Sequence, residues 1–305
     1  MKKQLSILLS VILLLLSGCA STDSNPATNQ PKDEKISYTI YYSHPTTINS
    51  EDIDSKGQSV YTFESADTKD FTLKADEPYQ NANAAESKTV TIDGQSLTLS
   101  YRESFDTPLA KCKTTALQAN GSYDLYRFSD DMGNDIDVHF RKNSNELIYY
   151  LNVAAYSTIG GNYTDEDATI RAANDLVTYF GMDAITYYQE KYINSSEDFI
   201  TVTYIHCIND YQTTDQIVFI YNRSGQLALM NADHKGVFDA FEKQLTSENL
   251  QAAKAALTKS IANTIEIDAP TLVMEAEGKV YLRIIGKNKQ NDSMSVPPRF
   301  YINVY

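Results

Sequence analysis

The sequence lacks several residues and spacings on which common enzyme families depend. None of its 305 residues is tryptophan, and its 12 glycines never stand two or four apart. The frames Gly-x-Gly-x-x-Gly, used for dinucleotides, and Gly-x-Ser-x-Gly, used by many hydrolases, are therefore absent. The four histidines lie far apart and none has the spacing of a metal-binding motif. A catalytic triad assembled from distant residues leaves no such signature, so a hydrolase remains an alternative.

Positive charge is also in short supply. The chain has 26 Lys+Arg against 40 Asp+Glu, which gives a formal net charge of −14. A nucleic-acid partner requires a basic surface that displaces counterions from phosphates, and this composition argues against one. The same sign argues against attachment to anionic lipid by charge alone.

Long apolar runs are absent except at the N-terminus. Lys2 and Lys3 precede the apolar stretch Leu5–Leu16, which is 12 residues long and interrupted only by two serines. A helix needs about 20 residues to cross the hydrocarbon core of a bilayer. A basic start followed by a shorter apolar stretch is typical of a secretion signal, which we place at residues 1–18.

The end of this signal carries a resemblance to a known class. Leu16-Ser17-Gly18-Cys19 resembles the lipobox of bacterial lipoproteins, in which the cysteine becomes the first residue and carries a diacylglycerol. The resemblance implies that Cys19 is lipidated with fatty acids such as palmitate, and that the protein lies at the extracytoplasmic face of the cell membrane. An ordinary signal peptide with an incidental cysteine is the alternative. Two acyl chains give stable anchoring, so an acidic protein need not bind lipid by charge.

Residues 19–35 contain no large apolar side chain. Such a segment cannot offset the entropy lost on ordering, so we expect a flexible tether. Removal of the signal takes away two lysines and changes the net charge from −14 to −16.

Residues 36–158 are expected to be rich in β structure. Asp93-Gly94 predicts a two-residue hairpin turn, because both residue types tolerate positive φ. We expect an antiparallel meander with one face in water, and the 22 tyrosines fit a half-buried sheet better than a binding surface. The predicted strands are Ile36–Tyr42, the hairpin Thr89–Tyr101, Tyr123–Phe128, Asp135–Arg141 and Glu146–Val153, with short strands near Val60 and Phe71.

Residues 159–305 show a different pattern that begins after Gly160-Gly161. Thr164 followed by Asp167 resembles a capping box, and Gly181 is placed to end the helix. Together the two regions predict an α+β fold. The predicted strands after this helix are Ile185–Tyr192, Phe199–Cys207, Gln216–Tyr221 and Gln226–Met230; a second helix, Thr246–Ala262, precedes strands Leu272–Met274, Lys279–Ile285 and Arg299–Val304.

A helix followed by a β-meander resembles the PepSY-type repeat. The resemblance is carried by Thr164-Asp-Glu-Asp-Ala168 and by Gln216–Leu227, with a looser match at Asn145-Glu-Leu147. It implies one or two such units, at 159–235 and 236–305. PepSY-type modules are non-catalytic and are associated with inhibiting peptidases or regulating activity in the cell envelope. The aspartate that usually precedes the turn is Asn222 here.

One group of acidic residues raises the question of metal binding. Alternation along the strand puts Asp135, Asp137, His139 and Arg141 on one face, and apolar residues on the other. Carboxylates beside a glycine turn are ligands that Ca²⁺ accepts, so Asp135 and Asp137 are candidate ligands. The alternative is a solvated strand face with ordinary surface charges.

The remaining cysteines are Cys112 and Cys207, which form an even pair once Cys19 is lipidated. Outside the cytoplasm such a pair can form a disulfide, and two free thiols are the alternative.

These features predict a non-catalytic, membrane-anchored lipoprotein that binds or regulates another envelope protein and needs no cofactor beyond a candidate Ca²⁺. A membrane-tethered hydrolase and a ligand- or solute-binding lipoprotein are the alternatives. Alternating β-α-β units, expected of many solute-binding proteins, are absent from the predicted pattern.

Overall fold

The computed structural model describes residues 38–42, 61–65, 77–106, 122–241, 245–261, 265–267, 271–274, 280–288 and 299–304. Every described element belongs to one compact unit, Ile36–Tyr305. The predicted signal, lipobox and tether lie outside the described residues, as do Cys19, Cys112 and the strand predicted near Phe71.

Five strands form the predicted antiparallel meander, and each pairs with the next. The turn between the first two is Asp93-Gly94, with φ of 54° and 71°, as the sequence predicts. The strands are β3 (Ser87–Ile92), β4 (Gln95–Phe105), β5 (Tyr123–Ser129), β6 (Asp135–Arg141) and β7 (Leu147–Asn152).

Three helices follow: α1 (Val153–Ser157), α2 (Asp165–Phe180) and α3 (Ala184–Tyr187). The predicted capping box is present at the start of α2, where the Thr164 hydroxyl accepts from the Asp167 N–H at 3.1 Å and the Asp167 carboxylate accepts from the Thr164 N–H at 3.1 Å. Gly181, with φ of 89°, ends the helix as expected.

The next four strands are antiparallel: β8 (Glu190–Ser195), β9 (Phe199–Ile208), β10 (Tyr211–Asn222) and β11 (Leu227–Asn231). The prediction of a continuous strand over Ile185–Tyr192 is wrong, because α3 occupies its first half. Tyr187 and Tyr188 instead direct their hydroxyls to the buried carboxylate of Asp215 on β10. That contact between distant residues outweighs the local β propensity of two tyrosines.

The C-terminal elements join the same sheet as two N-terminal strands. Strand β1 pairs with β15 antiparallel, and the parallel pairs are β1 with β2 and β10 with β13. The elements are α4 (Ser247–Ile261), β12 (Ile265–Ile267), β13 (Thr271–Met274), β14 (Val280–Asn288), β15 (Arg299–Asn303), β1 (Tyr38–Tyr42) and β2 (Tyr61–Ser65).

The strand order is β2-β1-β15-β14-β13-β10-β11-β7-β6-β5-β4-β3, with β12 on β14 and β8-β9 on β10. Strand β7 pairs with β11, so the sheet continues across the boundary expected near residue 158. The division into domains 36–158 and 159–305 stays a prediction. The fold is α+β, with mostly antiparallel sheet and few helices.

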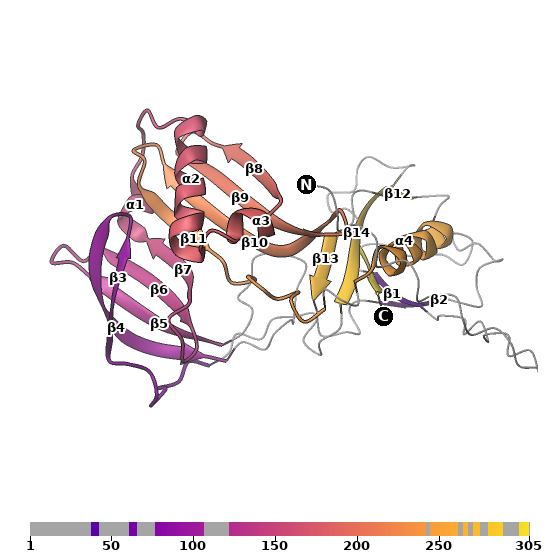
Figure 1. Cartoon of the computed structure of the whole chain (residues 1–305), viewed down its shortest axis with the longest axis horizontal. Coiled ribbons are helices and arrows are strands. Elements are labelled where there is room, and N and C mark those ends of the chain that lie inside the picture. Colours follow the sequence, from indigo (N-terminus) through magenta and orange to yellow (C-terminus); the bar gives the residue numbers. More distant parts are fainter. Residues whose placement is uncertain are drawn as a thin grey trace, which may run out of the picture. The chain divides into compact units, whose positions relative to one another are not determined.

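The helix α2 lies on one face of this sheet (Figure 1). Its buried residues Ala168, Ala172 and Leu176 belong to one hydrophobic core with side chains of both groups of strands, such as Val138 of β6 and Phe219 of β10. Small residues on the helix let it approach the sheet closely, and a shared core ties the two groups of strands together. Among the described helices, none combines the length and apolar character that crossing a membrane requires.

Candidate functional site

The strand β3 forms one end of the sheet. Among the described strands it pairs only with β4. Ile92 and Gln95 flank the two-residue turn and form a hydrogen-bonded pair, and such pairs alternate along an antiparallel ladder. The bond from Tyr101 N–H to the Glu86 carbonyl, at 2.9 Å, continues this alternation. The N–H and C=O groups of Thr89 and Thr91 therefore point away from β4.

The tip of the β3–β4 hairpin is fixed to α2. Arg171 of α2 forms an ion pair with Asp93, and the Tyr179 hydroxyl accepts a hydrogen bond from the Asp93 N–H at 3.1 Å. Arg171 also donates to the Gly225 carbonyl and lies over the ring of Tyr221, with 5.1 Å between guanidinium carbon and ring centre. Hydrogen bonds and nearby carboxylates raise the pKa of Arg171 despite its partial burial. One side chain thus ties the helix to two turns of the sheet.

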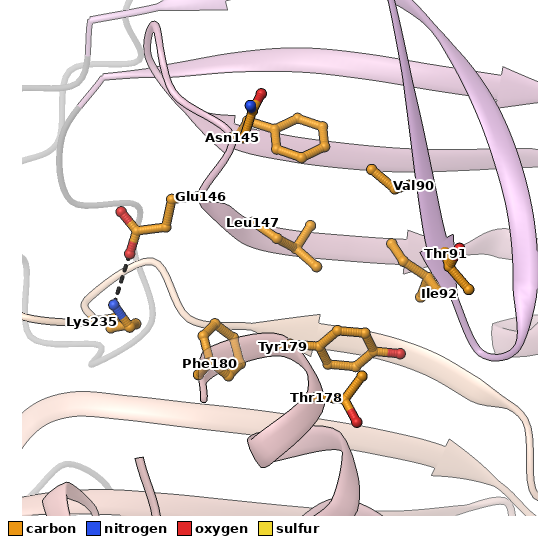
Figure 2. Close-up of a pocket in the computed structure, with 11 residues that line it drawn as sticks. Val90, Thr91, Ile92, Asn145, Glu146, Leu147, Thr178, Tyr179, Phe180 and Lys235 are labelled. Carbon is orange, nitrogen blue, oxygen red and sulfur yellow. Dashed lines mark hydrogen bonds and ion pairs between the residues drawn. The ribbon is translucent and has the colours of Figure 1, made fainter. Parts of the chain in front are cut away.

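Below this fixed tip, a pocket of about 370 Å³ opens between β3, the start of β7 and the end of α2. Figure 2 shows Leu147 at its centre, with Val90 and Ile92 on one side and Phe180 and the Glu146–Lys235 pair on the other. We call this pocket the β3 groove. Its lining residues are Val90, Thr91, Ile92, Phe140, Asn145, Glu146, Leu147, Thr178, Tyr179, Phe180 and Lys235.

The rim of the β3 groove carries charge. The Glu146 carboxylate accepts from Lys235 at 2.9 Å and from Arg141 at 2.7 Å. Burial pushes the pKa of Glu146 upward, but the hydrogen bonds from these two cations hold it below the usual range. One carboxylate is therefore shared by two cations.

A third cation lies at the start of β3. The Lys88 amine donates to the Ser144 carbonyl at 2.5 Å and stands 4.2 Å from the ring centre of Phe140, which lines the groove. Burial lowers the pKa of Lys88, and the charge of Asp124 partly opposes this. A lysine held over aromatic rings keeps a partly desolvated charge next to the groove.

A second polar cluster lies around Asp215, which is fully buried. Its two oxygens accept hydrogen bonds at 2.8 Å from the hydroxyls of Tyr187 and Tyr188, and the Gly236 N–H donates to it at 2.8 Å. The ring of Tyr187 stacks on His206, with 3.8 Å between ring centres. Burial raises the pKa of Asp215, which these donors partly offset. A carboxylate with three donors is satisfied, and we assign it the structural role of holding α3 to the sheet.

Asp233 differs from Asp215 because it is only 5% exposed and its Oδ1 has no hydrogen-bond partner within the described part of the chain. Burial raises the pKa of Asp233 to about 7, against the opposing charge of Arg141. In the sequence it stands two residues before Lys235, which lines the groove.

The candidate calcium ligands lie on the face of the sheet opposite α2, and the predicted alternation along β6 is present. Arg127 of β5 lies between them, 2.6 Å from Asp137 and 3.2 Å from Asp135. The Arg127 guanidinium thus supplies, between the two carboxylates, the positive charge that a bound Ca²⁺ would have provided. In the ranges described above, no group of three or more His, Cys, Asp or Glu side chains is arranged to hold a metal ion.

His139 lies on the same face as these carboxylates. Its ring is stacked between Tyr123 and Tyr149, with centre distances of 4.4 and 4.5 Å. The two tyrosines bury Nδ1, although part of the side chain reaches the surface. Burial lowers the pKa of His139 to about 4, so the ring is neutral near pH 7.

Cys207 is half-buried on β9, and burial together with Glu190 raises the pKa of its thiol to about 11. A thiol of this kind is a poor nucleophile near neutral pH. Because Cys112 lies outside the described residues, a disulfide between the two stays a prediction.

The sequence gives no signal for the β3 groove. Its walls come from four segments, near residues 90, 145, 180 and 235, which no local pattern connects. A partial signal exists in Arg171, an arginine on a helix whose buried residues are alanine and leucine, but its partner Asp93 lies 78 residues away.

Comparison with known proteins adds little. No protein-family model matches the sequence, and no curated protein is significantly similar to it. Among solved structures, the Bacillus megaterium YpeB C-terminal domain is similar at a TM-score of 0.32 and 9% identity, over 57% of this chain and 79% of that chain. A similarity of this size establishes neither a shared family nor a shared activity.

Proposed function

We propose that this chain is a non-catalytic lipoprotein that is anchored through Cys19 at the outer face of the cell membrane and binds or regulates another envelope protein through the β3 groove. The observation that carries the binding role is the groove itself. It combines an apolar floor with a few polar groups on its rim, which is the usual composition of a binding site.

The titratable side chains Asp215, His139 and Cys207 are poorly placed for catalysis. Asp215 has both oxygens occupied by tyrosine hydroxyls, and His139 is enclosed between two rings. Cys207 has a raised pKa. Each of these groups supports the fold in its present contacts, which favours binding over turnover.

We also propose that the chain contains one or two PepSY-type units, the first at residues 159–235 and the second at 236–305. Supporting this, α2 is followed by the four antiparallel strands β8 to β11, and the Arg223-Ser224-Gly225 turn joins the last two. The buried Asn222 side chain accepts from the N–H groups of Ser224 and Gln226 at 3.0 and 2.9 Å. An asparagine can thus perform the turn-forming role of the usual aspartate.

Affinity capture from an envelope fraction, followed by reconstitution, tests the proposed function. The full chain is compared with Val90→Glu, which places a charge in the groove, and with Val153→Glu, the same change at an exposed site of α1. We expect one stoichiometric protein to bind the native chain and Val153→Glu, with binding to Val90→Glu at least tenfold weaker.

The captured protein must bind again after purification, at one to one, for the proposal to stand. Equal binding to both variants would place the interface elsewhere. Substrate turnover by the purified chain without any bound protein would contradict the proposed class.

A further inference from the structure

The edge of β3 that no described strand covers runs along the groove. Val90, Thr91 and Ile92 all line it, and Figure 2 shows β3 beside Leu147. The outward N–H and C=O groups of Thr89 and Thr91 offer four positions for main-chain hydrogen bonds, as derived from the ladder. An unpaired edge of this kind is a template for an added strand.

The space beside this edge suits a short strand rather than a folded surface. The pocket has a volume of about 370 Å³. The two ends of β3 differ in their contacts with other elements. At Asp93 the edge is tied to Tyr179 of α2, whereas at Thr89 no described element is paired with it. A strand lying here would direct alternate side chains onto Leu147 and Phe140.

The charges near the groove indicate what such a strand carries. Lys235 lines the groove, and Lys88 stands over the ring of Phe140, which also lines it. The carboxylate in the lining, that of Glu146, is shared by Lys235 and Arg141. This local surplus of positive charge lies within a chain of net charge −14. A carboxylate on the partner would therefore be complementary to the groove although it is repelled by the chain as a whole.

We propose, on the basis of the function proposed above, that the partner binds through a short extended segment that adds as a strand to the free edge of β3. The segment places an apolar side chain over Leu147 and a carboxylate near Lys235. The main-chain bonds to Thr89 and Thr91 supply affinity for any extended chain, and the groove, with Lys235 in its lining and Lys88 over Phe140, selects apolar and acidic side chains.

A second copy of this chain is a weaker candidate occupant. Two β3 edges pairing with each other would bring two Lys88 side chains to one interface, and inward-pointing charge is a device that discourages edge-to-edge association. The net charge of the chain adds repulsion.

The probe for this proposal is a phage-displayed library of random linear heptapeptides, selected against the full chain in detergent. The key variant is Thr91→Pro, which removes one outward N–H without touching the β3–β4 ladder, since proline is tolerated on such an edge. Thr91→Ala keeps the N–H and serves as the matched control. Lys235→Met tests the charge, with Lys191→Met on exposed β8 as its control.

We expect enriched peptides with alternating apolar residues and a carboxylate. They should bind Thr91→Ala within twofold of the native chain, Thr91→Pro at least tenfold more weakly, and Lys235→Met about fivefold more weakly. In the native chain, which requires no variant to fold, the amide hydrogens of Thr89 and Thr91 should exchange at least tenfold more slowly with peptide bound.

Absence of enriched peptides, equal binding to Thr91→Pro, or unchanged exchange at both amides would overturn strand addition. The proposed function is tested separately. If the envelope protein captured above is lost with Val90→Glu but retained by Thr91→Pro, the function stands and strand addition is wrong. If no protein is captured, the proposed function itself fails.

Discussion

The guanidinium of Arg171 on α2 forms an ion pair with the carboxylate of Asp93 at the tip of the β3–β4 hairpin, 78 residues earlier in the chain. The Asp93 carboxylate also accepts from the Leu227 N–H at 3.3 Å. This contact fixes the end of the sheet against the helix. The β3 groove is the space that remains below it.

Replacing Arg171 by methionine should therefore loosen the hairpin. The side chains of Arg171 and Asp93 are 25% and 19% exposed. Breaking a buried pair costs about 3–5 kcal/mol, and partial solvent access reduces this, so we expect a loss of about 2–3 kcal/mol in the free energy of unfolding. Urea unfolding measures the loss, and faster hydrogen exchange along β3 should accompany it.

Arg127→Met is the matched control. Arg127 forms its pairs on the opposite face of the sheet, where Asp135 is 36% exposed. We expect a loss below about 1 kcal/mol there. Equal losses in the two variants would show that the contact with Asp93 has no special role in fixing the hairpin.

Local patterns predict much of the fold. Along β6, alternation correctly places Ile136, Val138 and Phe140 in the core. Asp93-Gly94 and the Thr164 capping box are also correct, because each depends on residues no more than three positions apart. These features follow from backbone geometry alone.

Contacts between distant residues explain what the sequence could not predict. The segment after Gly181 becomes α3 because Tyr187 and Tyr188 reach Asp215, 28 and 27 residues away. The groove likewise depends on how the hairpin closes over α2. Alternation correctly places Asp135 and Asp137 on one face. Their contact with Arg127, however, depends on the pairing of β5 with β6, which local patterns do not predict.

His139 should make the protein sensitive to acid. A histidine whose pKa falls from 6.5 to about 4 on folding stays neutral while the unfolded chain takes up a proton, so stability falls as pH drops from 6.5 to 4. At 1.36 kcal/mol per pKa unit this amounts to at most about 3 kcal/mol, and less where water reaches the ring edge.

His139→Phe keeps an aromatic ring between Tyr123 and Tyr149 but cannot take up a proton. We expect its free energy of unfolding to lie within about 1 kcal/mol of that of the native chain at pH 7.5 and to exceed it at pH 4.5. Melting temperatures across this range check the prediction. Parallel curves for the two proteins would mean that His139 is not buried as a neutral group.

Asp233 should give stability the opposite dependence on pH. Its pKa rises from 3.8 to about 7 on folding, so the unfolded chain releases a proton that the folded chain retains, and stability falls as pH rises from 4 to 7. The difference corresponds to at most about 4 kcal/mol.

Asp233→Asn removes this penalty. We expect its melting temperature to exceed that of the native chain at pH 8, with the difference shrinking toward pH 4. Asp131→Asn, in an exposed turn, is the control and should track the native chain throughout. A variant less stable than the native chain at pH 8 would show that the charged form of Asp233 is favoured in the fold.

The anchor is tested at Cys19. Cells fed labelled palmitate should incorporate it into the native chain and into Cys112→Ser, but not into Cys19→Ser, because the thioether requires the thiol of the lipobox. Protein detection in the same gel controls for expression. Label retained by Cys19→Ser would contradict lipidation at this residue.

Photocrosslinking in intact cells tests the central claim most directly. In one variant, a photoreactive phenylalanine analogue replaces Phe180 in the β3 groove. In a second variant of the same chain, it replaces Met132, which is 86% exposed in the β5–β6 turn. The account predicts a discrete adduct with one envelope protein from position 180 and none from position 132. The same adducts from both positions, or none from position 180, would contradict the claim that this groove binds a protein partner.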